Sequence, residues 1–176
     1  MLTRAERATV VPSGPPTSPR LLLAEVRASH TIFDGGWWPY SWSPAEELPG
    51  LVLALSARYG QIRQVMLHDG SWNAGFRRLA VDSAVVRMGW FVSVDPGVLI
   101  ATTEQGVQVD LLVVPPEATR ADAEAVMRRA ADPSNRLRAP AMLATLTPTA
   151  SADRTDSLRS HAVRGDGNAG TEPAAV

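Results

Sequence analysis

Short apolar stretches bounded by turn residues predict five strands, and in the first of them polar and apolar residues fall on opposite faces. In the first stretch, residues 20–27, one face carries Leu22, Ala24 and Val26 while Glu25 and Arg27 fall on the other. The other predicted strands cover residues 61–68, 84–92, 98–103 and 107–114. Turn sequences rich in Asp, Gly and Pro separate the last three strands, so we expect an antiparallel meander there.

Helical periodicity replaces this alternation over residues 43–60. Ser43 and Glu46 have the spacing of a capping box at the start of a helix. Pro49 lacks a backbone N–H and is expected to interrupt the first turn, so the main helix is predicted from about residue 48 to residue 58. Its buried stripe is predicted to be Leu48, Leu51, Val52 and Leu55.

A second helix is predicted after residue 119. Thr119 precedes it as the cap, with Asp122 at the reciprocal position, and Pro133 ends it. The residues expected to face inward are Ala123, Val126, Met127 and Ala130.

The predicted element order is β-α-β-β-β-β-α, which indicates an α+β fold. We expect a two-layer sandwich with a mostly antiparallel sheet of about five strands and two helices on one face. Residues 1–19 are rich in Pro, Ser and Thr and are predicted to be a disordered N-terminal arm. The folded domain is predicted over residues 20–140, followed by a mostly disordered tail over residues 141–176.

Such a sandwich leaves the second face of the sheet without a helix. Arg87 and Phe91 fall on one face of their predicted strand, and Asp110 and Leu112 on one face of another. Two interpretations stay open: a half-solvated sheet with cross-strand ion pairs, or a surface that forms a homodimer or binds another partner.

The composition removes several function classes. The net charge of −1 gives no reason to expect binding to nucleic acid, and no apolar run is long enough to predict a membrane span. The chain has no cysteine and all 17 of its basic residues are arginine, so thiolate chemistry and lysine Schiff bases are excluded. No cofactor is predicted. The lack of cysteine fits a cytoplasmic protein.

A tryptophan-rich loop is predicted over residues 31–42, and it holds three of the five tryptophans. Asp34 is followed by two glycines, which is turn chemistry that permits positive φ. Trp37 and Trp38 either close one end of the core or, with Asp34 as a polar anchor, line a pocket for a planar or cationic molecule. Packing is the favoured interpretation, because large aromatic side chains are usually buried.

Other side chains carry weaker signals for a site. His68 beside Asp69 could act as a general base, although a polar strand end explains it more simply. Trp72 and Arg87 are further residues that a ligand could contact. The three histidines have no metal-binding spacing, so no metal site is predicted.

Four ordered motifs resemble an uncharacterised family of domains that is found chiefly in actinobacteria and related high-GC bacteria. The motifs are D-G-G-W-W-P at residues 34–39, E-L-P at 47–49, R-M-G-W-F at 87–91 and D-L-L-V-V-P-P at 110–116. The resemblance spans roughly residues 20–130 and implies a small cytoplasmic bacterial protein. It brings no activity, ligand or catalytic residue with it.

Three functional hypotheses follow. The leading one is a non-enzymatic module that binds a small molecule or a protein through the loop at residues 31–42. The second is an enzyme in which Asp34, His68 and Asp110 meet as acid and base groups. The third is a regulatory or dimerising subunit that uses the outer face of the sheet.

Overall fold

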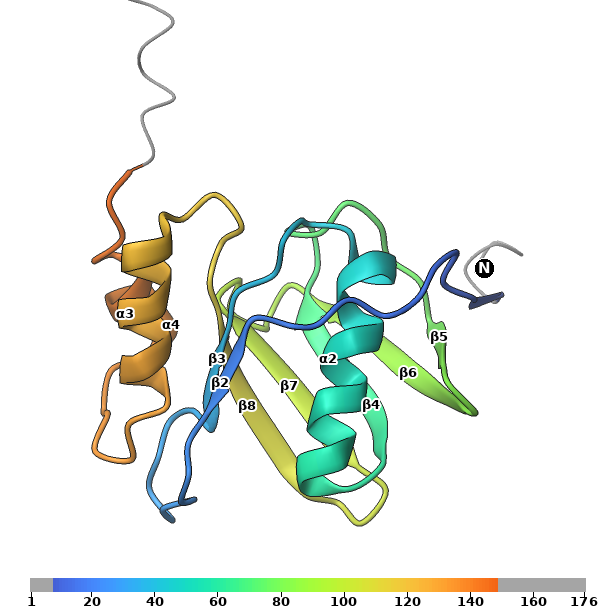
Figure 1. The fold of residues 1–176 in the computed structure, drawn as a ribbon, viewed down its shortest axis with the longest axis horizontal. Coiled ribbons are helices and arrows are strands. Elements are labelled where there is room, and N and C mark those ends of the chain that lie inside the picture. Colours follow the sequence, from blue (N-terminus) through green and yellow to red (C-terminus); the bar gives the residue numbers. More distant parts are fainter. Residues whose placement is uncertain (1–7, 149–176) are drawn as a thin grey trace, which may run out of the picture.

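The computed structural model describes residues 8–148, which form a single mixed sheet with helices on both faces (Figure 1). The strand order is β1-β5-β6-β4-β7-β8-β3-β2. In chain order, the strands are β1 (Thr9–Val10), β2 (Leu21–Leu23), β3 (Gly35–Trp37), β4 (Ile62–His68), β5 (Arg78–Val81), β6 (Ala84–Phe91), β7 (Val98–Thr103) and β8 (Gln108–Val113). The helices are α2 (Pro44–Tyr59), α3 (Arg120–Ala130) and α4 (Ala139–Leu143).

The α+β class is confirmed, but the antiparallel five-stranded sheet is wrong. Three of the strand pairs are parallel: β1 with β5, β3 with β8, and β4 with β6. Strand β4 lies between β6 and β7, so the predicted meander is broken there, while β7 and β8 still pair as consecutive antiparallel strands. Strand β4 occupies this position because its buried face, which includes Val65 and Leu67, belongs at the centre of the core.

The prediction that both helices cover one face is also wrong. Leu111 and Val113 of β8 point into the core beneath α2, whereas Leu112 and Val114 pack in a separate cluster with residues of α3 and α4. Because successive residues of a strand point to opposite faces, α2 must lie on one face and the other two helices on the other. From Leu111 onward, β8 is therefore buried on both faces.

The predicted buried stripes of the helices are confirmed. Leu48, Leu51, Val52 and Leu55 are buried in α2, and the four predicted residues of α3 are buried as well. Thr119 caps α3, since its hydroxyl accepts a hydrogen bond from the Asp122 N–H at 3.2 Å. The predicted interruption at Pro49 is wrong, because α2 runs from Pro44 to Tyr59 without a break. Pro49 removes one backbone hydrogen bond from the helix, and the burial of the apolar stripe holds the helix together across it.

The capping box predicted for α2 is absent. Ser43 makes no side-chain cap, although its carbonyl accepts the Glu47 N–H at 3.1 Å. The buried Glu47 carboxylate accepts from the Tyr40 N–H and the Ser41 hydroxyl, each at 3.0 Å. The loop before α2 is therefore held by the Glu47 carboxylate, and not by the predicted bond between the Glu46 side chain and Ser43.

Part of the predicted N-terminal arm is structured. Strand β1 extends the sheet beside β5, and Thr17 lies so close to α2 that a Cβ atom on Gly50 would be 1.9 Å from the Thr17 carbonyl oxygen. Residues 1–7 lie outside the described part of the chain, as do residues 149–176 of the predicted C-terminal tail. Helix α4 has no counterpart among the predicted elements, and it crosses the expected domain boundary at residue 140.

Candidate functional site

The tryptophan-rich loop is built into the sheet. Its residues Gly35 to Trp37 are strand β3, which pairs with β2 on one side and β8 on the other. Neither glycine has positive φ. They are required by close packing instead, because a Cβ atom on Gly35 would lie 2.2 Å from the Leu22 carbonyl oxygen, and one on Gly36 would lie 2.8 Å from the Met127 Cα atom.

Three of the tryptophans pack against one another on the α2 side of the sheet. Trp37 is fully buried and its ring stacks on Trp72, with centroids 5.6 Å apart and an interplanar angle of 13°. Trp42 meets the same Trp72 ring edge-on at 5.2 Å. The core therefore uses the apolar area of these rings, and Trp72 is itself only 8% exposed.

Trp38 points to the opposite face and is also buried. The guanidinium of Arg20 lies 3.4 Å from the centroid of the Trp38 ring and 4.0 Å from that of Tyr40. The indole N–H donates to the Pro115 carbonyl at 3.1 Å. The chain's own arginine thus occupies the ring face that a cationic ligand would need.

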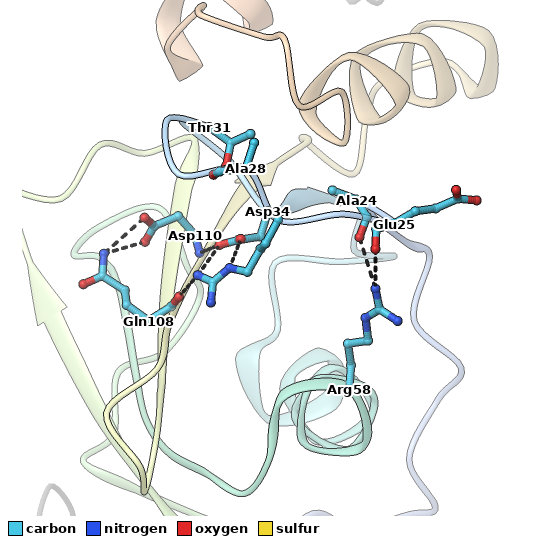
Figure 2. Close-up of polar contacts among 9 residues, drawn as sticks. Ala24, Glu25, Ala28, Thr31, Asp34, Arg58, Gln108 and Asp110 are labelled. Carbon is cyan, nitrogen blue, oxygen red and sulfur yellow. Dashed lines mark hydrogen bonds and ion pairs between the residues drawn. The ribbon is translucent and has the colours of Figure 1, made fainter.

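Asp34 is a buried carboxylate with several partners (Figure 2). Its Oδ1 atom pairs with the Arg27 Nε at 2.6 Å, and its Oδ2 atom accepts the Asp110 N–H at 2.8 Å. The Asp34 N–H in turn donates to the Asp110 carbonyl at 2.7 Å. Arg27 also donates to the Gln108 carbonyl. These contacts fasten the segment before β3 to strand β8, so Asp34 is a cross-link that is already paired.

Asp110 lies next to this pair but has a different environment. Its two carboxylate oxygens accept hydrogen bonds from the Gln108 side-chain amide at 2.9 and 3.1 Å (Figure 2). It forms no ion pair with any residue in the described range. Partial burial raises the pKa of Asp110 above the ordinary carboxyl value, the negative charge of Asp34 adds to this shift, and the Gln108 amide opposes it.

A cavity of about 460 Å³ opens beside Asp110, on the face of the sheet opposite α2. Strands β7 and β8 form its floor, and the loop before β3 and helix α4 form its walls. Apolar side chains make up most of the lining, with Asp95, Asp110 and Arg138 as its charged groups. The apolar lining residues include Ile32, Phe33, Val98, Ile100, Ala139 and Pro140.

Helix α4 reaches this position because Gly97 leaves room for it. A Cβ atom on Gly97 would be 2.5 Å from the Leu143 Cδ1 atom and 2.9 Å from the Ala139 Cβ atom. On the far side of Asp110, a second hollow of about 360 Å³ is lined by the loop from Arg27 to Thr31 together with Asp34. The Asp110 carboxylate therefore lies between an apolar cavity and a polar hollow.

The structure brings together only part of the predicted site. Asp34 and Asp110 are adjacent, but His68 lies on β4, two strands from β8, and its Nδ1 atom bonds to the Val94 carbonyl at 2.7 Å. Trp72 is on the α2 side of the sheet, and Arg87 is on β6, one strand farther from β8 than His68. Residues 8–148 contain no cluster of three or more His, Asp or Glu side chains that could hold a metal ion.

The sequence signal for the cavity is weak. Asp110 is predicted as an acid group, but nothing in the sequence assigns Arg27, Asp95, Gln108 or Arg138 to a site. Arg138 and α4 follow a stretch without apolar periodicity, and only the packing on Gly97 places them over the sheet. Ile32 and Phe33, the apolar residues of the 31–42 loop that reach the cavity, precede the conspicuous tryptophans.

The chain belongs to a family of unknown function, DUF5994, whose model matches residues 20–130. The matched region includes strands β2 to β8 and helices α2 and α3, so it contains Asp34 and Asp110 but not α4. No curated protein matches the chain, and no solved structure matches it. Among the described helices, none has the length and apolar character needed to span a bilayer.

Proposed function

We propose that this domain is a non-enzymatic binding module that holds a small organic cation with an apolar body in the cavity between strands β7–β8 and helix α4. One observation carries the proposal: a half-buried carboxylate, Asp110, stands at an apolar cavity and accepts hydrogen bonds from a neutral amide. A cavity of this size, with apolar walls and few polar groups, is typical of small-molecule sites.

The charges around the cavity favour a cation. The cavity lining carries two carboxylates, Asp95 and Asp110, and one guanidinium, Arg138. Arg27 compensates the neighbouring Asp34. Asp95 uses its Oδ1 atom to accept the Gly97 N–H at 2.8 Å, which leaves its charge in place. An ammonium group would donate to the Asp110 carboxylate and stabilise its charged form, which partial burial disfavours and which has a raised pKa for that reason.

The loop at residues 31–42 keeps a role in this proposal. Ile32 and Phe33 supply part of the apolar wall, and Asp34 fixes the backbone of Asp110. The buried tryptophans anchor the loop, and the residues just before them contact the ligand. The proposed ligand contacts therefore lie at the start of the loop, at Ile32 and Phe33, and not at Trp37 and Trp38.

An acid–base enzyme is less well supported. Asp34 is buried and paired with Arg27, so its carboxylate has no free position for proton transfer to a substrate. His68 contributes to neither of the two hollows beside Asp110.

Binding of matched probes tests the proposal. Phenethylamine, phenethyl alcohol and phenylacetate share an aromatic body and differ in charge, and their affinities can be measured by calorimetry and by thermal shift. We expect the amine to bind best and the carboxylate to bind worst. Asp110→Asn should remove most of the preference for the amine, because it keeps the size of the side chain but not its charge.

A blocking variant provides the control. Ala141 is exposed and lines the cavity, so Ala141→Phe should fill the space without disturbing the buried core, and all three probes should lose affinity. Equal binding of the amine to the parent protein and to both variants would refute the proposed site.

A further inference from the structure

Strand β6 is longer than its neighbour β5, so one end of β6 has no partner strand on that side (Figure 1). Strand β5 begins at Arg78, which pairs with Arg87. One further bond follows, from the Met88 N–H to the Arg77 carbonyl at 2.9 Å. Beyond this bond the pairing ends, and residues 89–91 of β6 have no strand beside them at this edge.

The direction of the backbone groups shows which residue of β6 is left open. Successive residues of a strand turn their N–H and C=O groups to opposite sides. Phe91 faces β4, because its carbonyl accepts the Asp69 N–H at 3.2 Å, whereas Met88 faces β5. The N–H and C=O of Trp90 therefore point to the side where β5 has ended. No group within residues 8–148 bonds to them there.

A cavity of about 400 Å³ lies along this open stretch of the edge. Residues 88–91 of β6 and residues 75–77 form most of its lining. The indole N–H of Trp90 donates to the Phe76 carbonyl at 2.7 Å, which fixes the ring beside the cavity. Gly75 leaves space next to this ring, since a Cβ atom on Gly75 would lie 3.7 Å from it. The cavity thus offers an indole ring and one unpaired backbone donor and acceptor.

The cavity carries one charged residue at each end. Arg77 lies at the Met88 end and Asp69 at the Phe91 end, as their backbone bonds show. A rise of about 3.4 Å per residue separates these two ends by roughly 10 Å. Both charged residues are exposed, and neither forms an ion pair within residues 8–148. A ligand with a carboxylate at one end and an ammonium group at the other would pair with both.

We infer that the edge of β6 binds a tripeptide with free termini, which adds a short antiparallel strand beside residues 89–91. An extended tripeptide spans about 10 Å, which matches the separation of the two charges. The charges also set its direction. The α-carboxylate meets Arg77 and the α-ammonium group meets Asp69, so the peptide runs opposite to β6.

In this direction the middle residue of the peptide lies across from Trp90. Because Trp90 is two residues after Met88, the pair continues the alternation of the β5–β6 ladder and exchanges two backbone hydrogen bonds. Residues directly opposite each other in an antiparallel pair project to the same face. The middle side chain therefore lies beside the indole ring, in the space that Gly75 leaves, and a small side chain fits there.

The peptide site is separate from the proposed cation site. The cavity at Trp90 and the cavity at Asp110 share no lining residue. Asp110→Asn should therefore leave tripeptide binding unchanged, and either proposal can fail while the other stands.

An NMR titration of the full chain with tri-alanine tests the site. The Trp90 amide should shift, and it should exchange more slowly with solvent, because the peptide supplies the acceptor that the strand edge lacks. The amides of Gly89 and Phe91 already point to β4 and serve as internal references, so their exchange should change little. We expect an affinity in the millimolar range, since both terminal ion pairs are exposed to solvent.

Capped peptides identify the two ends of the ligand. N-acetyl tri-alanine lacks the ammonium group and tri-alanine amide lacks the carboxylate, so each should bind about threefold more weakly than the free tripeptide. Arg77→Gln should weaken the free tripeptide by about the same factor and leave the peptide amide unaffected, because that peptide has no carboxylate to pair. Asp69→Asn should act in the same way on the acetylated peptide.

A blocking variant shows whether the cavity itself is used. Gly75 is exposed and does not have positive φ, so Gly75→Leu should fill the cavity without unfolding the protein, and the Trp90 shift should disappear. Gly14→Leu is the matched control, since a Cβ atom on Gly14 meets nothing within 4 Å. The inference is overturned if saturating tri-alanine leaves the Trp90 amide unchanged, or if both capped peptides bind as tightly as the free one. Full binding by Gly75→Leu, with a parental circular dichroism spectrum, would also overturn it.

Discussion

Replacing Asp34 tests whether the carboxylate fastens the loop before β3 to the sheet. Asp34→Ala removes the acceptor of the Asp110 N–H and the partner of Arg27. An unsatisfied backbone donor costs about 1–3 kcal/mol when it is kept from water. The ion pair adds about 1 kcal/mol, because the Arg27 side chain is 44% exposed and solvent screens the interaction.

The expected loss of unfolding free energy for Asp34→Ala is therefore about 3 kcal/mol. Asp34→Asn keeps the side-chain volume and one oxygen acceptor for the Asp110 N–H, so it should lose only about 1 kcal/mol, chiefly through the charge-assisted bond to Arg27. For a domain of this size, the alanine variant should lower the melting temperature by roughly 6–12 °C.

Urea denaturation followed by tryptophan fluorescence measures these losses, because the indole stack at Trp37 and Trp72 is buried only in the folded state. Glu25→Ala is the matched control: it removes an exposed carboxylate from the same segment and should change the stability by less than about 0.5 kcal/mol. Arg27→Ala should cost about 1 kcal/mol, and its effect should be smaller in the Asp34→Ala background, where the Arg27 bond to the Gln108 carbonyl remains but the ion pair is gone. The reasoning is refuted if Asp34→Ala is as stable as Glu25→Ala.

Three other outcomes follow from the structure. The pKa of Asp110 is raised in the folded state. The Asp110 carboxyl therefore stabilises the fold below the ordinary carboxyl pKa, and this stabilisation is lost as the pH rises through the pKa of the folded state. The melting temperature of the parent protein, relative to that of Asp110→Asn, should fall across this pH window. Gly36→Ala places a Cβ atom against helix α3 and should cost about 1–3 kcal/mol, whereas Gly14→Ala, whose Cβ atom meets nothing within 4 Å, should have little effect in the same melts. Gly50→Ala should push Thr17 away from α2, and faster limited proteolysis within residues 12–18, with unchanged amide protection of β4, would show it.

The local signals in the sequence are reliable where an element lies on one side of the core. Helix α3 has the predicted cap and the predicted buried residues, and α2 has the predicted apolar stripe. In both cases the apolar residues recur with the helical period, and this recurrence needs no knowledge of the partner surface.

Two short strands have sequence signals that are weak or typical of turns. Strand β5 has four residues and joins β6 through Asp82 and Ser83, in a hairpin turn without glycine. Asp82 takes the positive φ of 52° that glycine usually supplies. Strand β3 begins with two glycines, which are depleted in strands, and only the approach of Leu22 and Met127 explains them.

In the candidate site, the sequence identifies individual residues, whereas the tertiary structure brings them together. Asp34 and Asp110 can be named from the sequence as polar residues among apolar neighbours, but their adjacency comes from the parallel pairing of β3 with β8. The residues that line the cavity with Asp110 come from the loop before β3, from β7 and β8, and from α4. No sequence period connects these segments, since their contact depends on strand order and on the space at Gly97.

The sequence alone determined the α+β class, the two principal helices, the excluded chemistries and the likeness to a family without an assigned function. Each of these depends on local composition or on a short repeat. The tertiary structure decided that the sheet is mixed, that helices lie on both faces, that Trp37, Trp38 and Trp72 are buried, and that Asp110 stands at a cavity. These features depend on which distant segments pair. The pairing is determined by the burial of β8 on both faces and by close packing on glycines such as Gly35, Gly36 and Gly97.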